Sequence, residues 1–409
     1  MNNDKYLNIA IIVQFYSGLK TILDHSHWSH SGSPAYYNFI KLVDRSIDIK
    51  YQLILLETVT GCKGVQKLYL DNLKYPIIIL PYFSITLSSR IPLLKKIENF
   101  YNKIRQYYLV FVYTKKSNFY YVDRDNIIFS FVALYFKKTK VIIRLLGVTE
   151  SLFMHLTSRN NPLSKIIKSV FINSNVNFIC SNDGSYAEKV KIKYGSKFHL
   201  LFNGVNKDLQ RNFKKSNKLR IVYLSRIVKD KGHEDFIYGV AKSKLINSLD
   251  IKIIGDGNLK NDMVDLANNL ALANCIDFIG LLNHSSALDE LSKADLVISM
   301  NHDGVFGNGV LEAAKMGIPL IVLKHPGSPS SSKYNLFELQ RDENLLDNIG
   351  KTIDRAYTDK EWLLDLENKS KEFASYYLHD WSSRVNSELK IVRNFFLCFL
   401  RLFLRCLFC

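Results

Sequence analysis

The chain has 409 residues, of which 47% are apolar and 23% are charged. At about 150 residues per domain this length predicts two to three domains with ordinary cores, and it excludes a disordered, collagenous or membrane-bundle protein. Six cysteines, three of them among the last twelve residues, give no disulfide framework and favour a reducing compartment.

The positive charge lies in the first half of the chain. The formal net charge is +17, and residues 1–205 hold 27 basic and 12 acidic side chains. Such a surface attracts phosphates, anionic lipid headgroups or nucleic acid, and charge alone does not choose among them. The second half is close to neutral.

Short β-branched apolar runs alternate with segments of helical pattern along the whole chain. The strands predicted in the first half are Asn8–Val13, Tyr51–Leu56, Ile77–Leu80, Leu109–Tyr113, Val141–Arg144 and Phe178–Cys180. Those in the second half are Arg220–Leu224, Ile251–Ile254, Ile276–Ile279, Leu296–Ser299 and Pro319–Val322. This alternation predicts an α/β fold of two Rossmann-like doubly wound domains that face each other across a cleft.

A turn-rich segment, residues 201–213, separates the two halves and is followed by a polar run. We therefore expect an N-terminal domain at 1–205 and a C-terminal domain at 206–375. Residues 376–409 are expected to form a closing helix and an apolar, basic tail.

The two ends of the chain predict neither a secretory signal nor a membrane span. The first apolar run follows Asp4 and Lys5 and lacks a small-residue cleavage site. The last fifteen residues hold thirteen apolar ones, interrupted by Arg401 and Arg405. That run is too short to span a bilayer but suits a helix lying in the headgroup layer, and a terminal helix packed on the protein body is the alternative.

The strand Arg220–Leu224 leads into a loop that carries Arg226 and Lys231 and ends at Gly232. Two cations at the end of a strand stabilise the charge that develops on a departing diphosphate. The alternative is that both side chains project into solvent.

Two glycine-containing segments follow. The strand Ile251–Ile254 ends in the turn Gly255-Asp-Gly257, where the backbone can approach a ligand closely. A Gly-rich loop then opens a helix, whose first N–H groups form an anion site. Glu312 in the first turns of that helix can accept hydrogen bonds from a ribose diol, or it can be a solvated carboxylate.

Together these motifs resemble the retaining GT-B glycosyltransferases of family four, the glycosyl transferases group 1. The matching segments are Phe202-Asn-Gly-Val205, Leu224–Gly232, Gly255–Gly257, Phe278-Ile-Gly280 and Phe306–Pro319, in the order of the family. The resemblance is dense over about residues 200–325 and covers the first half by architecture only.

The resemblance implies a role for each matching position. Arg226 and Lys231 would hold the donor diphosphate, and the donor site would include Gly255, Gly257, Phe306, Gly307, Asn308, Gly309 and Val310. Glu312 would hold the ribose. Gly32 and Ser33, in a loop after the first strand, would face the donor phosphates. The acceptor would enter along the N-terminal domain.

Some positions depart from the family pattern. Gly304 stands where the family has the first of two glutamates, and the neighbouring Asp303 is the expected substitute. Ser225 replaces a common glycine. The strand Val141–Arg144 and the residues after it, up to Val148, hold no histidine where many members present one to the sugar, which leaves Arg144 as the nearest polar candidate. His25, His27 and His30 lack nearby cysteine or carboxylate ligands, so we expect no metal site.

The expected function is that of a retaining glycosyltransferase, which moves a sugar from a nucleoside-diphosphate-sugar to a lipid-linked or polysaccharide acceptor in cell-surface glycan synthesis. No cofactor or metal is expected, since Arg226 and Lys231 supply the charge. The expected location is cytoplasmic and peripheral, on the anionic inner face of the membrane. A catalytically impaired binding subunit and a sugar-nucleotide epimerase remain alternatives, and nucleic-acid binding is not expected.

Overall fold

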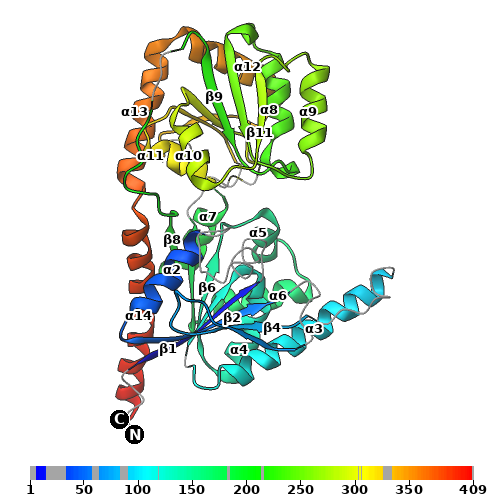
Figure 1. Cartoon of the computed structure of the whole chain (residues 1–409). Coiled ribbons are helices and arrows are strands. Elements are labelled where there is room, and N and C mark those ends of the chain that lie inside the picture. Colours follow the sequence, from blue (N-terminus) through cyan, green and yellow to red (C-terminus); the bar gives the residue numbers. More distant parts are fainter. Residues whose placement is uncertain are drawn as a thin grey trace.

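The computed structural model describes residues 6–14, 34–57, 64–82, 91–117, 119–181, 185–212, 216–302, 304, 306–325 and 334–407. They form an α/β protein with one sheet in each of two domains, stacked one above the other in Figure 1. The predicted α/β architecture of two domains is therefore confirmed.

The first sheet has eight strands in the order β3-β4-β2-β1-β5-β6-β7-β8. All neighbours are parallel except β3 and β4, which run antiparallel. The strands are β1 (Leu7–Gln14), β2 (Ile49–Leu56), β3 (Gln66–Leu68), β4 (Ile77–Leu80), β5 (Phe119–Asp123), β6 (Lys140–Leu145), β7 (Val176–Ser181) and β8 (Phe198–Leu201). The helices between them are α2 (Pro34–Arg45), α3 (Pro92–Tyr113), α4 (Ile127–Lys137), α5 (Glu150–Leu156), α6 (Pro162–Ile172) and α7 (Ala187–Tyr194).

The second sheet has six parallel strands in the order β11-β10-β9-β12-β13-β14. They are β9 (Leu219–Leu224), β10 (Leu249–Ile254), β11 (Ile276–Gly280), β12 (Leu296–Ser299), β13 (Leu320–Leu323) and β14 (Phe337–Leu339). The helices are α8 (His233–Ala241), α9 (Lys260–Asn269), α10 (His284–Ser292), α11 (Asn308–Lys315), α12 (Leu345–Thr358) and α13 (Lys360–Tyr377). The strand order reverses between β9 and β12, which is where open α/β sheets bind ligands.

The last helix, α14 (Trp381–Leu407), returns from the second domain to the first (Figure 1). Val385, Leu389 and Val392 are buried in the same apolar cluster as Phe39 of α2. Because α14 packs beside α2, the described part of the C-terminal segment belongs to the body of the first domain as far as Phe396. No described helix combines the length and the apolar character that a membrane span requires.

One predicted strand is wrong: Leu109–Tyr113 is the last part of helix α3. Glu98, Asn102, Gln106 and Val110, four residues apart, are all buried, so the segment packs with helical periodicity. The strand of this region is β5, which lies a few residues further on and is buried at all five positions. Periodicity alone does not separate a short apolar run in a buried helix from a strand.

Candidate donor-binding site

Strand β9 presents the predicted diphosphate loop at its carboxyl end. The loop turns back at Gly232, whose φ of +67° lies in the left-handed region. A Cβ at this position would meet the carbonyl oxygen of Met300 at 2.1 Å, so the close approach requires glycine. The hydroxyl of Tyr223 donates to the carbonyl of Lys231 and accepts from the N–H of Met300, which ties the loop to the end of β12.

The two predicted cations differ in how they are held. Arg226 is exposed, on the side of the loop that faces the cleft. Lys231 is largely buried, with Nζ 3.1 Å from Asn301 Oδ1 and 2.8 Å from Asp230 Oδ2. Lys231 is therefore positioned by its neighbours, whereas Arg226 can move toward a ligand.

His233 lies directly beneath this loop. It is 3% exposed, and its Nε2 lies 3.3 Å from Ser225 Oγ. Burial, assisted by the charge of Lys231, lowers the pKa of His233 to about 4. The imidazole is therefore neutral near pH 7, and the positive charge of the loop rests on its lysines and Arg226.

The Gly255-Asp-Gly257 turn supports the loop from behind. Built at Gly255, a Cβ would lie 1.9 Å from the carbonyl oxygen of Ser225, and at Gly257 it would lie 2.1 Å from that of Ile227. Neither glycine lines the cavity described below. The structure therefore places both glycines where they shape the backbone around Arg226, and the sequence-based expectation of close contact with a ligand is not supported.

Helix α11 brings the second part of the site to the same place. Its N-cap is Gly307, which has no side chain to cap the first N–H groups. Asn203 of the interdomain linker donates to Asn308 Oδ1 at 3.0 Å, and Gly309 packs against Leu224 of β9. Phe306 is held at the edge of an aromatic cluster with Tyr334 and Phe373. The start of α11 thus offers backbone donors beside the cation loop.

A cavity of about 480 Å³ joins these groups between the two domains. The C-terminal domain contributes Ser225, Arg226, Lys231, Ser299, Asn301 and the predicted residues Phe306, Gly307, Asn308, Gly309 and Val310. The N-terminal domain contributes Pro34, Ala35, Leu146 and Ser181, and the linker contributes Phe202 and Asn203. Sequence reasoning gave no role in the site to Asn203 and Asn301, although Asn203 lies inside the motif Phe202–Val205 and Asn301 comes shortly after the predicted strand Leu296–Ser299.

Glu312 does not line this cavity. It is 8% exposed, and the N–H of His284 lies against it, with Nε2 2.8 Å from Oε1. This hydrogen bond raises the pKa of His284. Since His284 is itself exposed, a ribose at the edge of the site can reach Glu312 only beside this histidine. The sequence did not predict the contact between His284 and Glu312.

Several residues predicted for the site cannot be compared with the structure, whereas Gly304 can. Gly32, Ser33 and Asp303, with His25, His27 and His30, lie outside the described residues. Gly304 is described and has a φ of +67°, a backbone conformation that most side chains disfavour. A glutamate here, as in the family pattern, would therefore require a different loop.

The structure corrects the candidacy of Arg144. Its side chain is 1% exposed, and Nη1 lies 2.8 Å from Glu388 Oε1 of α14. The guanidinium thus belongs to a buried ionic cluster and cannot face the transferred sugar. Its role is structural.

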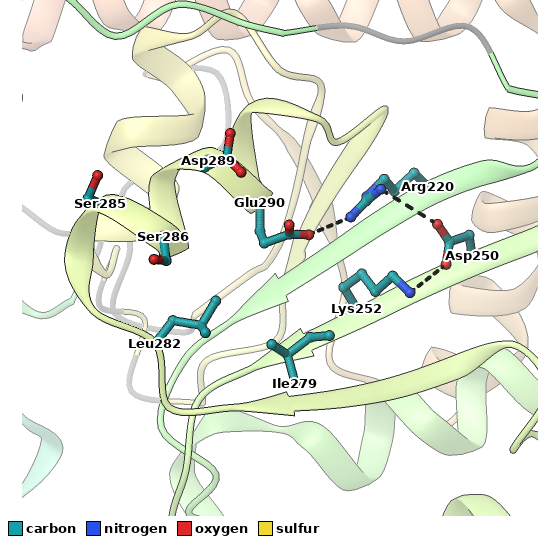
Figure 2. A pocket seen from close by; sticks show the side chains of 9 residues that line it. All are labelled: Arg220, Asp250, Lys252, Ile279, Leu282, Ser285, Ser286, Asp289 and Glu290. Carbon is teal, nitrogen blue, oxygen red and sulfur yellow. Dashed lines mark hydrogen bonds and ion pairs between the residues drawn. The ribbon is translucent and has the colours of Figure 1, made fainter.

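A larger, shallower hollow lies elsewhere on the C-terminal domain (Figure 2). It has a volume of about 660 Å³ and lies between α10 and the sheet. Its two cations are paired with carboxylates of the same hollow: Arg220 with Glu290 and Asp250, and Lys252 with Asp250. Because both cations are already paired, this hollow offers an anion no exposed cation like Arg226, and the interdomain cavity is the stronger candidate site.

Among the described residues, no cluster of three or more histidine, cysteine, aspartate or glutamate side chains is arranged to hold a metal ion.

Comparison with known proteins identifies the class of fold. HepE of Anabaena, solved in complex with UDP and glucose, superposes with a TM-score of 0.63 at 13% identity, covering 95% of this chain and all of HepE. WaaG, a glycosyltransferase of lipopolysaccharide biosynthesis, superposes with a TM-score of 0.62 at 12% identity, covering 94% of this chain and 99% of WaaG. The chain has the GT-B fold of these glycosyltransferases.

The C-terminal domain carries a recognisable family signature. Residues 205–373 match the family model of the glycosyl transferases group 1. An uncharacterized glycosyltransferase of Methanocaldococcus jannaschii is 21% identical over 229 residues, 53% of this chain. The chain spans about half of that relative, 56% of its length. Fold and family match together support a glycosyltransferase.

Proposed function

We propose that the protein is a retaining glycosyltransferase that uses a nucleoside-diphosphate-sugar. The observation that carries the proposal is the meeting of Arg226, Lys231 and the start of α11 in one interdomain cavity. These groups suit a diphosphate whose negative charge grows as the bond from the sugar breaks. HepE is described with UDP and with UDP-glucose, which makes uridine diphosphate sugars the first donors to test.

In the proposed reaction the bond between the anomeric carbon and the diphosphate oxygen breaks on the same face at which the acceptor hydroxyl attacks. The acceptor proton passes to the departing diphosphate. No covalent glycosyl-enzyme is needed, so a pair of carboxylates is not required. The anomeric configuration of the product, read by proton NMR, tests this part of the proposal.

We propose that no divalent metal takes part, because the cations of the loop neutralise the leaving diphosphate. Turnover should then be the same with a metal chelator as with added Mg²⁺. Turnover that requires added metal would contradict this role for Arg226 and Lys231.

The proposed acceptor is a lipid-linked or polysaccharide glycan at the cytoplasmic face of the membrane. The support is the excess of 27 basic over 12 acidic residues in positions 1–205 and the apolar, basic tail after Phe395. WaaG is described as acting in lipopolysaccharide biosynthesis, which favours the same class of acceptor.

The decisive experiment replaces the two cations one at a time. Arg226→Ala and Lys231→Ala should each reduce nucleoside-diphosphate release from the donor by about 100-fold, which corresponds to about 2.7 kcal/mol of transition-state stabilisation. Lys229→Ala is the matched control, because this exposed lysine lies on the same loop but does not line the cavity. Unchanged rates in folded Arg226 and Lys231 variants would overturn the assignment.

A catalytically impaired binding subunit is the second candidate. It is favoured by Gly304, which stands at the position of the family's first glutamate and has a positive φ. Such a protein would bind a nucleoside diphosphate through Arg226 and Lys231 but would release none from a donor, with or without acceptor. Calorimetric binding together with the release assay separates the two functions.

A further inference from the structure

Helix α3 buries polar side chains and exposes apolar ones, which is the reverse of an ordinary surface helix. Its polar residues Glu98, Asn102 and Gln106 are 2%, 1% and 1% exposed. Its exposed large apolar side chains are Leu93, Ile97, Phe100, Tyr101, Ile104, Tyr108 and Val112. Spacings of three and four residues place these side chains on one face of the helix.

The buried polar side is well satisfied, so this orientation is a stable arrangement. Gln106 Nε2 donates to the carbonyl of Glu57 at 2.8 Å, and Lys95 pairs with Glu98 at 3.2 Å. Asn102 Nδ2 donates to the carbonyl of Glu98 at 2.9 Å. These contacts differ in what they fix: the Glu98 contacts lie within α3, whereas the Gln106 hydrogen bond joins the helix to Glu57. Turning the apolar face inward would break that hydrogen bond, so it helps to hold the apolar face outward.

The exposed face is large and lies at the edge of the molecule. Phe100 is 69% exposed and Tyr108 is 67% exposed. In Figure 1 the helix runs outward from the first sheet, and its first turns project beyond the rest of the domain. The neighbouring helix α4, in contact through Phe111 and Phe129, exposes Phe136 at 79%. An apolar face of this extent marks an interaction surface.

The charges of α3 indicate which surface it meets. The helix has four basic residues, Lys95, Lys96, Lys103 and Arg105, and a single acidic one, the buried Glu98, which pairs with Lys95. Lys103 is directed inward and donates to Gln14 Oε1 at 2.9 Å, so Lys96 and Arg105 are the cations of α3 left for an external surface. Two more lysines, Lys115 and Lys116, follow it and are exposed. A second copy of the chain, docked face to face, would bring these like charges together, which is unfavourable. A bilayer with anionic headgroups accepts both the apolar side chains and the flanking cations.

We propose that the exposed face of α3 inserts into the headgroup layer of an anionic membrane. This helix, and not the C-terminal tail alone, then anchors the N-terminal domain at the bilayer. The inference extends the proposed function, because an acceptor held in a membrane is reached through this domain, but the binding itself requires no catalysis.

The test measures binding of the full-length protein to vesicles of phosphatidylglycerol and phosphatidylethanolamine by co-sedimentation. The double variant Ile97→Ser with Phe100→Ser should bind at least about tenfold more weakly than the unchanged protein, because two apolar side chains no longer enter the lipid. The matched control is Ile47→Ser with Ile192→Ser, which removes residues 90% and 83% exposed on other parts of the same domain. Equal binding of the α3 variant and the control would overturn the proposal.

Further arms separate the alternatives. A variant ending at Phe396 should keep most of the vesicle binding, and loss of all binding in that variant would assign the anchor to the tail. Vesicles of phosphatidylcholine alone should bind less protein, and equal binding would remove the role of charge. Self-association that depends on Ile97 and Phe100, without vesicle binding, would replace the membrane by a second copy of the chain.

The outcome is independent of the donor site. Vesicle binding is measured without nucleotide, so it can succeed even if donor turnover fails. The α3 variant should release nucleoside diphosphate from a donor with a water-soluble acceptor at the rate of the unchanged protein, whereas lower release would show that α3 serves the catalytic fold.

Discussion

At the carboxyl end of β5, Asp123 shows how strongly burial can act on one side chain. It lies beside the end of β1, where the strand order of the first sheet reverses. Its carboxylate accepts from the N–H of Gln14 at 2.5 Å and from Asn126 Nδ2 at 2.7 Å. Burial outweighs these hydrogen bonds and raises the pKa of Asp123 to about 6. The folded protein therefore holds this proton more tightly than the unfolded chain does.

We predict that Asp123 makes the protein less stable as the pH rises from about 4 to 6. In this window the folded state binds the proton and the unfolded state has lost it, so deprotonation favours unfolding by about 1–3 kcal/mol. Asp123→Asn should remove this dependence, because the amide cannot ionise and can still accept from Gln14. Chemical unfolding at a series of pH values measures it, with the exposed Asp71→Asn as control. A steep decline that persists in Asp123→Asn would contradict the assignment.

At the scale of elements, the linker and the start of α14 form one joint between the domains. The N–H of Val205 donates to the carbonyl of His379 at 3.0 Å, and Arg384 Nε donates to the carbonyl of Phe202 at 2.7 Å. Gly204 lies against Trp381, so closely that an added Cβ would stand 2.7 Å from its Cα. The chain thus crosses between domains twice at the same place, next to the Asn203 contact with α11.

Gly204→Ala should therefore disturb both crossings. The methyl group meets backbone on one side, so Trp381 and the linker must move apart, at a cost of about 1–3 kcal/mol in the free energy of unfolding. Donor binding should weaken as well, since Asn203 is displaced from Asn308. Gly64→Ala is the control, because a Cβ there meets no atom within 4 Å. Equal unfolding midpoints in urea for the two variants would show that the joint tolerates the methyl group.

For the whole molecule, a buried ionic cluster fastens the closing helix to the first domain. Glu388 is fully buried and pairs with both Arg144 of β6 and Arg384 of α14, while the Tyr121 hydroxyl donates to it. Burial opposes ionisation, but the two guanidinium groups outweigh it and lower the pKa of Glu388. Since α14 follows the second domain in sequence, this cluster holds the end of the chain on the N-terminal domain.

Glu388→Gln should destabilise the protein by about 3–5 kcal/mol, because two buried arginines lose their counter-charge. In the unchanged protein the lowered pKa means that the stabilisation is present above the unfolded pKa of glutamate, about 4.3, and is lost as the pH falls through the folded pKa. The variant should lack this acid-induced loss. Thermal unfolding between pH 3 and 7 tests both statements, with the exposed Glu343→Gln as control. Wild-type stability in Glu388→Gln would show that the cluster contributes little.

Much of the donor side could be predicted from local sequence because its groups stand on short, contiguous motifs. A buried β-branched run such as Arg220–Leu224 favours a strand, and whatever follows it must emerge at the carboxyl edge of the sheet. Arg226, Lys231 and the start of α11 therefore reach one cavity by connectivity alone. The α/β class follows from the same alternation of strands and helices.

Long-range packing decided the rest. The sequence around Arg144 predicts a residue of the cleft. In the folded protein Arg144 pairs instead with Glu388 of α14, which lies 244 positions away in the sequence. The apolar segment Leu109–Tyr113 satisfies the pattern of a strand, yet it continues helix α3, whose buried Gln106 donates to the carbonyl of Glu57 in a distant part of the first domain. Which face of α3 meets solvent, and which side of the Gly255 turn meets protein, depends on contacts between distant segments. Such contacts leave no trace in local periodicity, since burial is a property of the assembled chain.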